Sequence, residues 1–346
     1  MPVNVALIGF GYAGRTFHAP LIHAVEGLTL HTVVTSRPDE AGELAAGARL
    51  VATPEEAFAD PAVDLVVIAA PNDRHAPLAI QALEAGKAVV VDKPFALDLA
   101  EARGVVEVAE RTGRLLSVFH NRRWDADFLT LQALIAEGHL GRVARFESRF
   151  DRYRPEVRDR WREADVPGAG VWMDLGPHLI DQALRLFGPP RSVFAHIGAD
   201  RDGAKADDAF LAVLDYDRLT VTLGADMLSL AGTPRLIVQG TGGGWIKHGL
   251  DAQEDAMKAG VRPGDAFEGR AWGADPRPGR LADAEGTESQ TTGVGGDYRA
   301  YYAGVRDALL GSGPNPVPSA EALAVMAVID AGRESARTGR AVAPVI

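Results

Sequence analysis

A lysine and an aspartate–histidine pair have the residue types and spacing that acid–base chemistry needs. Lys93 comes just after the apolar run 88–91 and before Pro94, where a lysine beside a proline that could be cis is placed to point at a substrate. Asp174 and His178 are four residues apart, so on a helix that begins at or near Asp174 they share one face. A carboxylate beside an imidazole orients the ring and favours its protonated form, which prepares a general acid or base near neutral pH.

Each of these residues also has a structural interpretation. Lys93 could be a surface lysine in a turn. Asp174 could cap a helix while His178 packs as a hydrogen-bonded core histidine. The pair could also supply two ligands of a metal site, but no third ligand is evident and we expect no metal.

Three glycines close the first apolar run, residues 3–8, and predict a dinucleotide-binding turn. The first permits a tight turn, the second lets the backbone approach a pyrophosphate, and the third lets the helix expected over 13–24 pack closely. The pyrophosphate then lies at the positive end of that helix. Such spacing is frequent in ordinary loops, and the strand–helix–strand context, completed by the apolar run 28–34, favours the dinucleotide. The residues expected to contact the cofactor here are Gly9, Gly11, Tyr12, Ala13 and Gly14.

The end of the second strand predicts which dinucleotide binds. An Asp or Glu at this point would grip the ribose 2′-hydroxyl of NAD, whereas this chain has Ser36 and Arg37. A hydroxyl and a guanidinium suit a 2′-phosphate, because Arg forks onto phosphate and stacks on adenine. We therefore expect NADP (NADPH). In the alternative interpretation, Arg37 is a solvated loop residue and Asp39 or Glu40 reaches the ribose.

Composition excludes several classes of protein. The 346 residues are 47% hydrophobic and 24% charged, which is ordinary for a globular protein. The net charge of −11 leaves no basic excess for nucleic-acid binding. The absence of cysteine excludes disulfides, iron–sulfur clusters, thiolate zinc sites and a cysteine nucleophile.

The length and the first residues of the chain predict the number of domains and the cellular location of the protein. The chain exceeds the size at which one core stops growing, so we expect two domains, 1–121 and 122–346. The first four residues lack a basic leader region, and no apolar stretch approaches a membrane span. We expect a cytoplasmic protein without a membrane partner.

The elements that position these residues change in character near residue 121. Before it, apolar strands alternate with helices, which predicts an α/β, parallel, doubly wound Rossmann sheet. These are strands 63–70, 88–91 and 115–120 and helices 76–85 and 99–111. After it, closely spaced strands predict a mostly antiparallel sheet. A helix is expected over 127–137 and a half-exposed strand over 142–150. Further strands are expected near 193–197, 209–216, 219–225 and 235–239. Residues 260–296, rich in Gly, Pro, Asp and Arg, are expected to be a long irregular excursion.

Polar clusters follow several strands of the first sheet. Ligands of doubly wound folds bind at the carboxyl ends of the strands, so these clusters should line one crevice. They are Pro71-Asn72 with His75, Asp92-Lys93-Pro94, and residues 120–125 with Asn121 and Arg122. Together with Tyr153, Trp161 and Arg162, residues Asn121 and Arg122 offer hydrogen-bond donors and a flat ring to a bound ligand, and each could equally be a packing residue.

Together these motifs resemble the Gfo/Idh/MocA oxidoreductase family, nearly end to end. The motifs that carry the resemblance are the glycine turn, Pro71-Asn72 with His75, Asp92-Lys93-Pro94, and Gly-x-x-x-Asp-x-Gly-x-His from Gly170 to His178. The resemblance implies an N-terminal Rossmann domain, a C-terminal α/β domain with a large, mostly antiparallel open sheet used in oligomerisation, and hydride transfer between a nicotinamide and a sugar or polyol. Carried over, the family's catalytic lysine falls on Lys93, and its Asp and His on Asp174 and His178.

A narrower resemblance is to the NADP-dependent scyllo-inositol dehydrogenase subgroup. It rests on residues 117–125, 152–157, 160–163 and 247–251 and on the Ser36-Arg37 cofactor argument. One departure is Asp92, where most family members have Glu, which puts a role of that side chain in doubt but not that of Lys93.

The resemblance implies a division of roles. His178 would exchange the substrate proton, Asp174 would orient the ring, and Lys93 would stabilise charge on the substrate oxygen. The residues expected to bind substrate are Lys93, Arg122, Tyr153, Trp161, Asp174 and His178. Those expected to bind the cofactor, besides the glycine turn and Ser36-Arg37, are Pro71, Asn72, His75, Lys93, Pro94, Asn121, Trp161 and Arg162.

Other activities remain open on the same residues. An aldose dehydrogenase is the alternative within the oxidoreductases. A regulatory NADP sensor would be expected to lack one of the catalytic trio, and a redox-cycling lyase or glycosidase would consume no net NADPH. We expect a small-molecule substrate and a homodimer or homotetramer.

Overall fold

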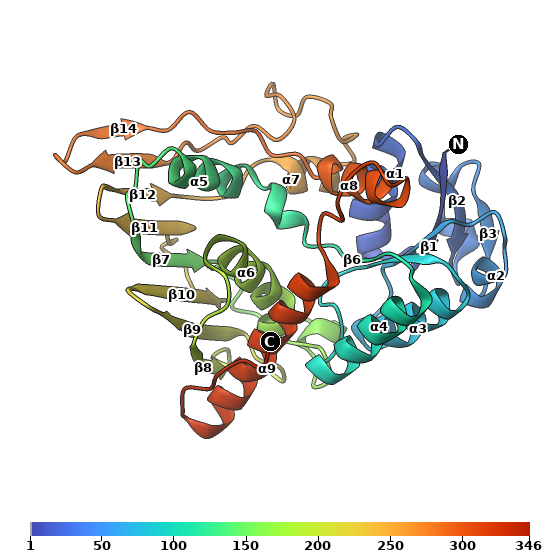
Figure 1. Ribbon diagram of the computed structural model, residues 1–346, viewed down its shortest axis with the longest axis horizontal. Coiled ribbons are helices and arrows are strands. Elements are labelled where there is room, and N and C mark those ends of the chain that lie inside the picture. Colours follow the sequence, from blue (N-terminus) through green and yellow to red (C-terminus); the bar gives the residue numbers. More distant parts are fainter. Residues whose placement is uncertain (1) are drawn as a thin grey trace. The chain divides into compact units, whose positions relative to one another are not determined.

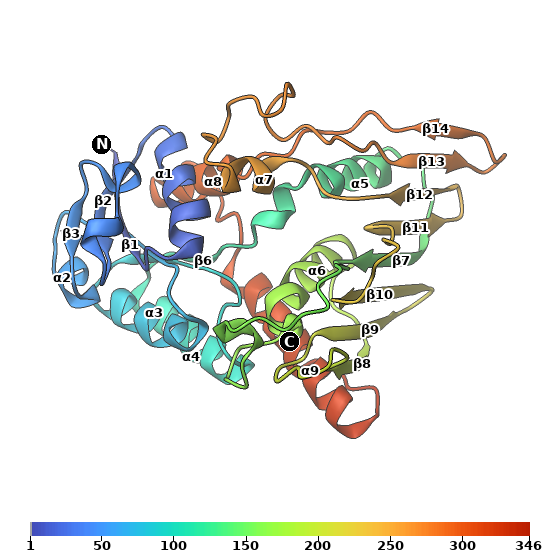
Figure 2. The same cartoon turned by 180° about the vertical axis from the view of Figure 1, so that it is seen from behind.

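The computed structural model describes residues 2–346, which form two compact units (Figures 1 and 2). The first unit contains the chain up to Trp124 together with Ala252–Trp272 and Asp297–Ala322. The second contains Asp125–Asp251, Gly273–Gly296 and Leu323–Ile346. Among the described residues, no helix combines the length and the apolarity needed to cross a membrane.

The first unit has the predicted Rossmann sheet. Its six strands are parallel and lie in the order β3-β2-β1-β4-β5-β6, with the order reversing between β1 and β4. Every residue of β4 and β5 is buried, because helices cover both faces of a parallel sheet. The strands are β1 (Val3–Ile8), β2 (Leu28–Val34), β3 (Arg49–Val51), β4 (Leu65–Ile68), β5 (Ala88–Val91) and β6 (Leu116–Val118).

The helices of this sheet follow the predicted alternation. They are α1 (Ala19–Ala24), α2 (Pro54–Phe58), α3 (His75–Glu84) and α4 (Leu99–Thr112). The helix expected over 13–24 contains a π-helical turn, Gly14–His18, before α1. Pro20 explains the wider turn, because its ring lacks an N–H and would clash with the carbonyl four residues earlier.

Two later segments pack with the Rossmann sheet. They carry α7 (Gln253–Lys258) and α8 (Arg299–Leu309). The carbonyl of Trp124 accepts hydrogen bonds from the side chain of Gln253 and from the backbone N–H of Asp297. The first unit therefore contains two segments beyond the predicted boundary at residue 121.

The second unit is built on the predicted, mostly antiparallel sheet. Its eight strands lie in the order β14-β13-β12-β11-β7-β10-β9-β8, and only the β7–β10 pair is parallel. The strands are β7 (Val143–Arg149), β8 (Ser192–Gly198), β9 (Ala209–Tyr216), β10 (Leu219–Asp226), β11 (Leu236–Gly240), β12 (Gly243–Lys247), β13 (Arg280–Asp283) and β14 (Glu288–Gln290).

One face of this sheet is covered by helices. The unit contains α5 (Ala126–Ala136), α6 (Val171–Phe187) and most of α9 (Ser319–Thr338), and α6 packs on β9 and β10. Residues of β9 alternate between buried and exposed, so the opposite face is open, with Phe194 and Leu211 exposed on it.

The prediction that 260–296 is irregular was wrong in part. The segment contains β13 and β14, which extend the sheet by two strands at one edge (Figure 1). Both strands are short and largely exposed, so they carry no apolar alternation that a sequence pattern could reveal.

Candidate functional site

The glycine turn joins β1 to the first helix of the first unit. Gly9 has a φ of +93°, and a Cβ there would lie 2.5 Å from the carbonyl oxygen of Ala69. A Cβ on Gly14 would lie 2.2 Å from the carbonyl oxygen of Gly9. The fold itself therefore requires glycine at both positions.

Gly11 differs from these two glycines. A Cβ built on it would meet no described protein atom within 4 Å, so packing does not demand glycine there. The backbone beside it is open to a close approach from outside, next to the N-terminus of the helix. The turn therefore fits the pyrophosphate of a dinucleotide.

The residues after β2 are exposed. The guanidinium of Arg37 forms an ion pair with the carboxylate of Glu40 at 3.0 Å, and both side chains are more than half exposed. Such surface pairs contribute little free energy, so a phosphate can replace Glu40 at small cost. Glu40, which was the alternative ribose ligand, is engaged by Arg37 itself.

The segment after β4 places Asn72 and His75 in buried positions. His75 begins α3, and its ring nitrogens lie 2.7 Å from the carbonyl oxygen of Pro94 and 2.9 Å from that of Ala70. Burial lowers the pKa of His75, against the opposing charge of Asp92. These contacts favour a structural role in joining the ends of β4 and β5, and cofactor binding by His75 stays a prediction.

Lys93 lies at the carboxyl end of β5 and is half-buried, and its peptide bond to Pro94 is cis. The backbone N–H of Lys93 donates to the Asp92 carboxylate at 2.8 Å. Burial alone would raise the pKa of Asp92, but His18, Lys93 and His75 overcome this effect and hold it below its ordinary value. An anionic carboxylate thus lies beside Lys93.

Asn121 and Arg122 lie in a short helical turn after β6, and both are buried. The guanidinium of Arg122 pairs with the carboxylate of Glu254 on α7 and approaches the hydroxyl of Tyr298 at 3.4 Å. Burial opposes ionisation of Glu254, but Arg122 and Lys258 lower its pKa to about 2. Arg122 therefore anchors α7, and substrate binding by Arg122 stays a prediction.

In the second unit, α6 begins at Val171, three residues before Asp174. Asp174 is therefore not the capping residue, as one interpretation had it. The cap comes from Asp207, whose carboxylate accepts from the N–H of Trp172 at 2.6 Å. Gly170, with a φ of +91°, makes this possible, because a Cβ there would lie 1.9 Å from the Asp207 carboxylate.

Asp174 and His178 occupy successive turns of α6. Asp174 forms an ion pair at 3.6 Å with Arg162, whose guanidinium stacks on the ring of Trp161 at 4.6 Å. His178 is buried, with its ring edge-to-face against Phe150 at 6.3 Å. The unit thus brings Trp161, Arg162 and Asp174 together beside a helix that presents His178 one turn later.

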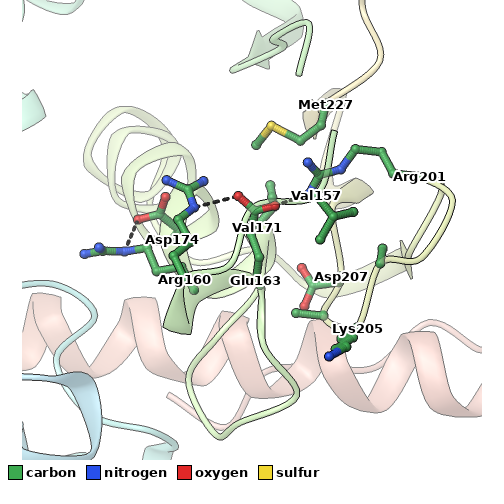
Figure 3. Close-up of a pocket in the computed structure, with 13 residues that line it drawn as sticks. Val157, Arg160, Glu163, Val171, Asp174, Arg201, Lys205, Asp207 and Met227 are labelled. Carbon is green, nitrogen blue, oxygen red and sulfur yellow. Dashed lines mark hydrogen bonds and ion pairs between the residues drawn. The ribbon is translucent and has the colours of Figure 1, made fainter. Parts of the chain in front are cut away.

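A small pocket lies beside Asp174, shown in Figure 3. Its volume of about 20 Å³ holds about one water molecule. Arg201 and Arg160 both point at Glu163, and Arg201 also donates to the carbonyls of Arg154 and Glu156. Arg201 therefore fixes the loop that carries Trp161 and Arg162. Tyr153, at the start of this loop, is half exposed and bridges to Leu228.

Sequence reasoning missed Asp207, Arg201 and His18. Asp207 and Arg201 bind residues 35 to 47 positions away in sequence, so no local spacing predicts them. His18 is the fully buried histidine of the π-helical turn. Within residues 2–346, no group of three or more His, Asp or Glu side chains is arranged to hold a metal ion.

Comparison with known proteins agrees with this architecture. Residues 3–120 match the model described as "Oxidoreductase family, NAD-binding Rossmann fold". Residues 132–345 match the model described as "Oxidoreductase family, C-terminal alpha/beta domain". Both are Gfo/Idh/MocA models, and together they cover most of the chain.

Similar proteins occur among curated sequences and solved structures. The uncharacterized oxidoreductase YdgJ of Escherichia coli K12 is 50% identical over 97% of this chain and 96% of its own. The scyllo-inositol 2-dehydrogenase (NADP(+)) IolW of Bacillus subtilis 168 is 36% identical over 98% and 95%. The structure of YPO2259 from Yersinia pestis is 48% identical, with a TM-score of 0.92 over 100% and 97% of the two chains.

Proposed function

The chain belongs to the Gfo/Idh/MocA oxidoreductase family, and from this premise we propose that it is an NADP-dependent oxidoreductase acting on a cyclic polyol or sugar. The reaction interconverts a secondary alcohol and a ketone, with scyllo-inositol and its inosose as the first candidates. The observation that carries the proposal is the combination of an open backbone at Gly11 with Lys93 in one unit and His178 in the other. The relative IolW supports the choice of cofactor and substrate.

In this proposal, residues of the first unit bind the cofactor. The open backbone at Gly11 and the helix N-terminus receive the pyrophosphate, and Ser36 and Arg37 receive the 2′-phosphate. When bound, the nicotinamide supplies or accepts the hydride. We assign this role to residues 1–121, with substrate binding and association assigned to residues 122–346.

We assign proton transfer to and from the substrate oxygen to His178. During oxidation the imidazole accepts the proton of the substrate hydroxyl, and during reduction it returns a proton to the same oxygen. Lys93 Nζ donates a hydrogen bond to that oxygen and stabilises negative charge on it. Asp174, tied to the 151–170 loop through Arg162, orients the imidazole from one helical turn away.

The open sheet face offers a surface for self-association. Phe194 and Leu211 are each almost half exposed on adjacent antiparallel strands. Exposed apolar side chains of this size are typical of protein contact surfaces. We propose that two or four copies of the chain associate through this face.

A substrate panel tests the proposed function. Inositols, inososes and the aldoses glucose, xylose and arabinose are assayed with NADP(H) and NAD(H) by absorbance of the reduced nicotinamide. We expect the largest kcat/KM with scyllo-inositol or its inosose and with NADP(H). A preference for an aldose would make that aldose, and not scyllo-inositol, the proposed substrate. A strict preference for NAD would refute the argument from Ser36 and Arg37 for NADP. Turnover of a glycoside without net NADPH change would refute the reaction class.

A further inference from the structure

His18 lies in the first unit, near Asp92, the residue before Lys93. It is fully buried, and its Nδ1 lies 2.6 Å from the hydroxyl oxygen of Tyr302 on α8. Its ring packs against Phe119 at a centroid distance of 4.6 Å. The ring of Phe119 and the phenol of Tyr302 therefore fix the orientation of this imidazole, although neither the glycine turn nor the proposed proton transfer uses it.

The other ring nitrogen of His18 faces the carboxylate of Asp92. Nε2 lies 3.6 Å from Oδ2 of Asp92 and has no hydrogen-bond partner among the described residues. Because a carboxylate only accepts, Nε2 carries the proton. Nδ1 is then the acceptor for the hydroxyl of Tyr302, whose pKa burial raises well above its ordinary value. Tyr302 thus donates to His18, and the protonated Nε2 of His18 faces the Asp92 carboxylate at 3.6 Å.

Asp92 connects this chain of contacts to Lys93. Its other oxygen, Oδ1, accepts the backbone N–H of Lys93 at 2.8 Å. The two oxygens are therefore contacted by different groups, Oδ2 by His18 and Oδ1 by the backbone of the next residue.

We propose that His18, backed by Tyr302, is a positioning residue that keeps Asp92 anionic and fixed beside Lys93. This inference rests on the proposed function only for the role of Lys93. A fixed anion beside Lys93 attracts its ammonium group and so limits where the side chain can point. His18 thus acts on the reaction through Asp92 and does not touch the substrate.

The other groups that face Asp92 limit what a change at His18 can do. They are His75 on α3, Lys93 itself, and the two tyrosines of α8, Tyr301 and Tyr302. Both tyrosines are neutral near physiological pH, since burial raises the pKa of each. Without His18, burial of the carboxylate is less well opposed, so the pKa of Asp92 should rise.

The test compares neighbouring tyrosines and two replacements of His18. Tyr302→Phe removes the hydroxyl that bonds His18, whereas Tyr301→Phe removes a hydroxyl, also fully buried, that donates to Ser117 at 3.0 Å. His18→Leu removes both ring nitrogens, and His18→Gln retains an N–H donor. The rate constant kcat/KM is measured from pH 5 to 9 for each variant and the wild type.

We expect the acid limb of the kcat/KM profile to move up in His18→Leu, so that kcat/KM falls about twofold or more at pH 5 and little at pH 7.5, and to move less in Tyr302→Phe. His18→Gln should recover part of the shift, and Tyr301→Phe should leave the profile in place. Equal shifts in the two tyrosine variants, or no shift in either His18 variant, would overturn the proposal. If His18→Leu does not fold, Tyr302→Phe and His18→Gln carry the same comparison.

A double-mutant cycle separates this inference from the proposed function. In an Asp92→Asn background, His18→Gln and Tyr302→Phe should cost no further kcat/KM, because the carboxylate they act on is gone. The same cycle is measured in urea unfolding at pH 7.5, where the effects of His18→Gln and Asp92→Asn should be non-additive. Additive losses in both measurements would overturn the pairing. A wild type inert with every substrate would defeat only the proposed function, and the unfolding cycle would still decide the pairing.

Discussion

Replacing each glycine of the nucleotide-binding turn by alanine should separate folding from cofactor binding. A Cβ on Gly14 would lie 2.2 Å from a backbone oxygen, and one on Gly9 would lie 2.5 Å from another at a φ of +93°. Overpacking of this kind costs about 3 kcal/mol, and a left-handed alanine adds about 1–2 kcal/mol at Gly9. Gly11→Ala meets nothing within 4 Å among the described residues, so its stability should change by less than about 1 kcal/mol.

The three variants are compared by thermal unfolding without cofactor and by titration with NADPH followed by fluorescence. Gly9→Ala and Gly14→Ala should lower Tm by about 5 °C or more. Gly11→Ala should keep the wild-type Tm and weaken NADPH binding at least about tenfold, or 1.4 kcal/mol. The reasoning fails if Gly11→Ala binds NADPH as the wild type does, or if it melts as early as Gly14→Ala.

Three further variants test other contacts. Glu254→Gln should lower the free energy of unfolding at pH 7 by about 3 kcal/mol, because Arg122 and a neighbouring lysine hold the pKa of Glu254 at about 2 against burial. That contribution is complete above pH 4.5 and is lost as the pH falls towards 2, so the gap in urea midpoint should narrow below pH 4.5; a constant gap contradicts it. Arg37→Ser should weaken NADPH at least about tenfold and leave NADH unchanged in parallel titrations, and equal losses would point away from the 2′-phosphate. Asp207→Ala should lower the free energy of unfolding by about 1 kcal/mol, because the backbone N–H of Trp172 loses its capping carboxylate. Chemical unfolding measures this loss, and an unchanged midpoint would mean that Asp207 does not stabilise the start of α6.

The first unit was largely predictable because its signals are local. The strand ending at Ile8, the glycines after it and the buried strand before Lys93 each follow from residues close in sequence. The predicted helix 13–24 is present, but its π-helical turn was not foreseen. That turn depends on Pro20 and on the register of one hydrogen-bonded turn, which hydrophobic periodicity does not resolve.

Tertiary contacts limited the prediction of the site. The sequence placed Asp174 near a helix start, but the start is three residues earlier because Gly170 lets Asp207 approach. Likewise, the pairing of the Arg122 guanidinium with Glu254, 132 residues away in sequence, was not foreseen, and substrate binding by Arg122 stays a prediction. Contacts over such separations leave no mark on the local pattern. The pairing of His18 with Asp92 belongs to the same class.

Transfer of a labelled hydride tests the central claim most directly. The wild type and His178→Asn are supplied with scyllo-inosose and NADPH deuterated at C4 of the nicotinamide, and the inositol product is examined by mass spectrometry. We expect deuterium on the carbinol carbon with the wild type, and turnover at least about a hundredfold lower for His178→Asn with NADPH affinity unchanged. No deuterium transfer to this or any other polyol or sugar, or near-normal turnover by His178→Asn, would contradict the account.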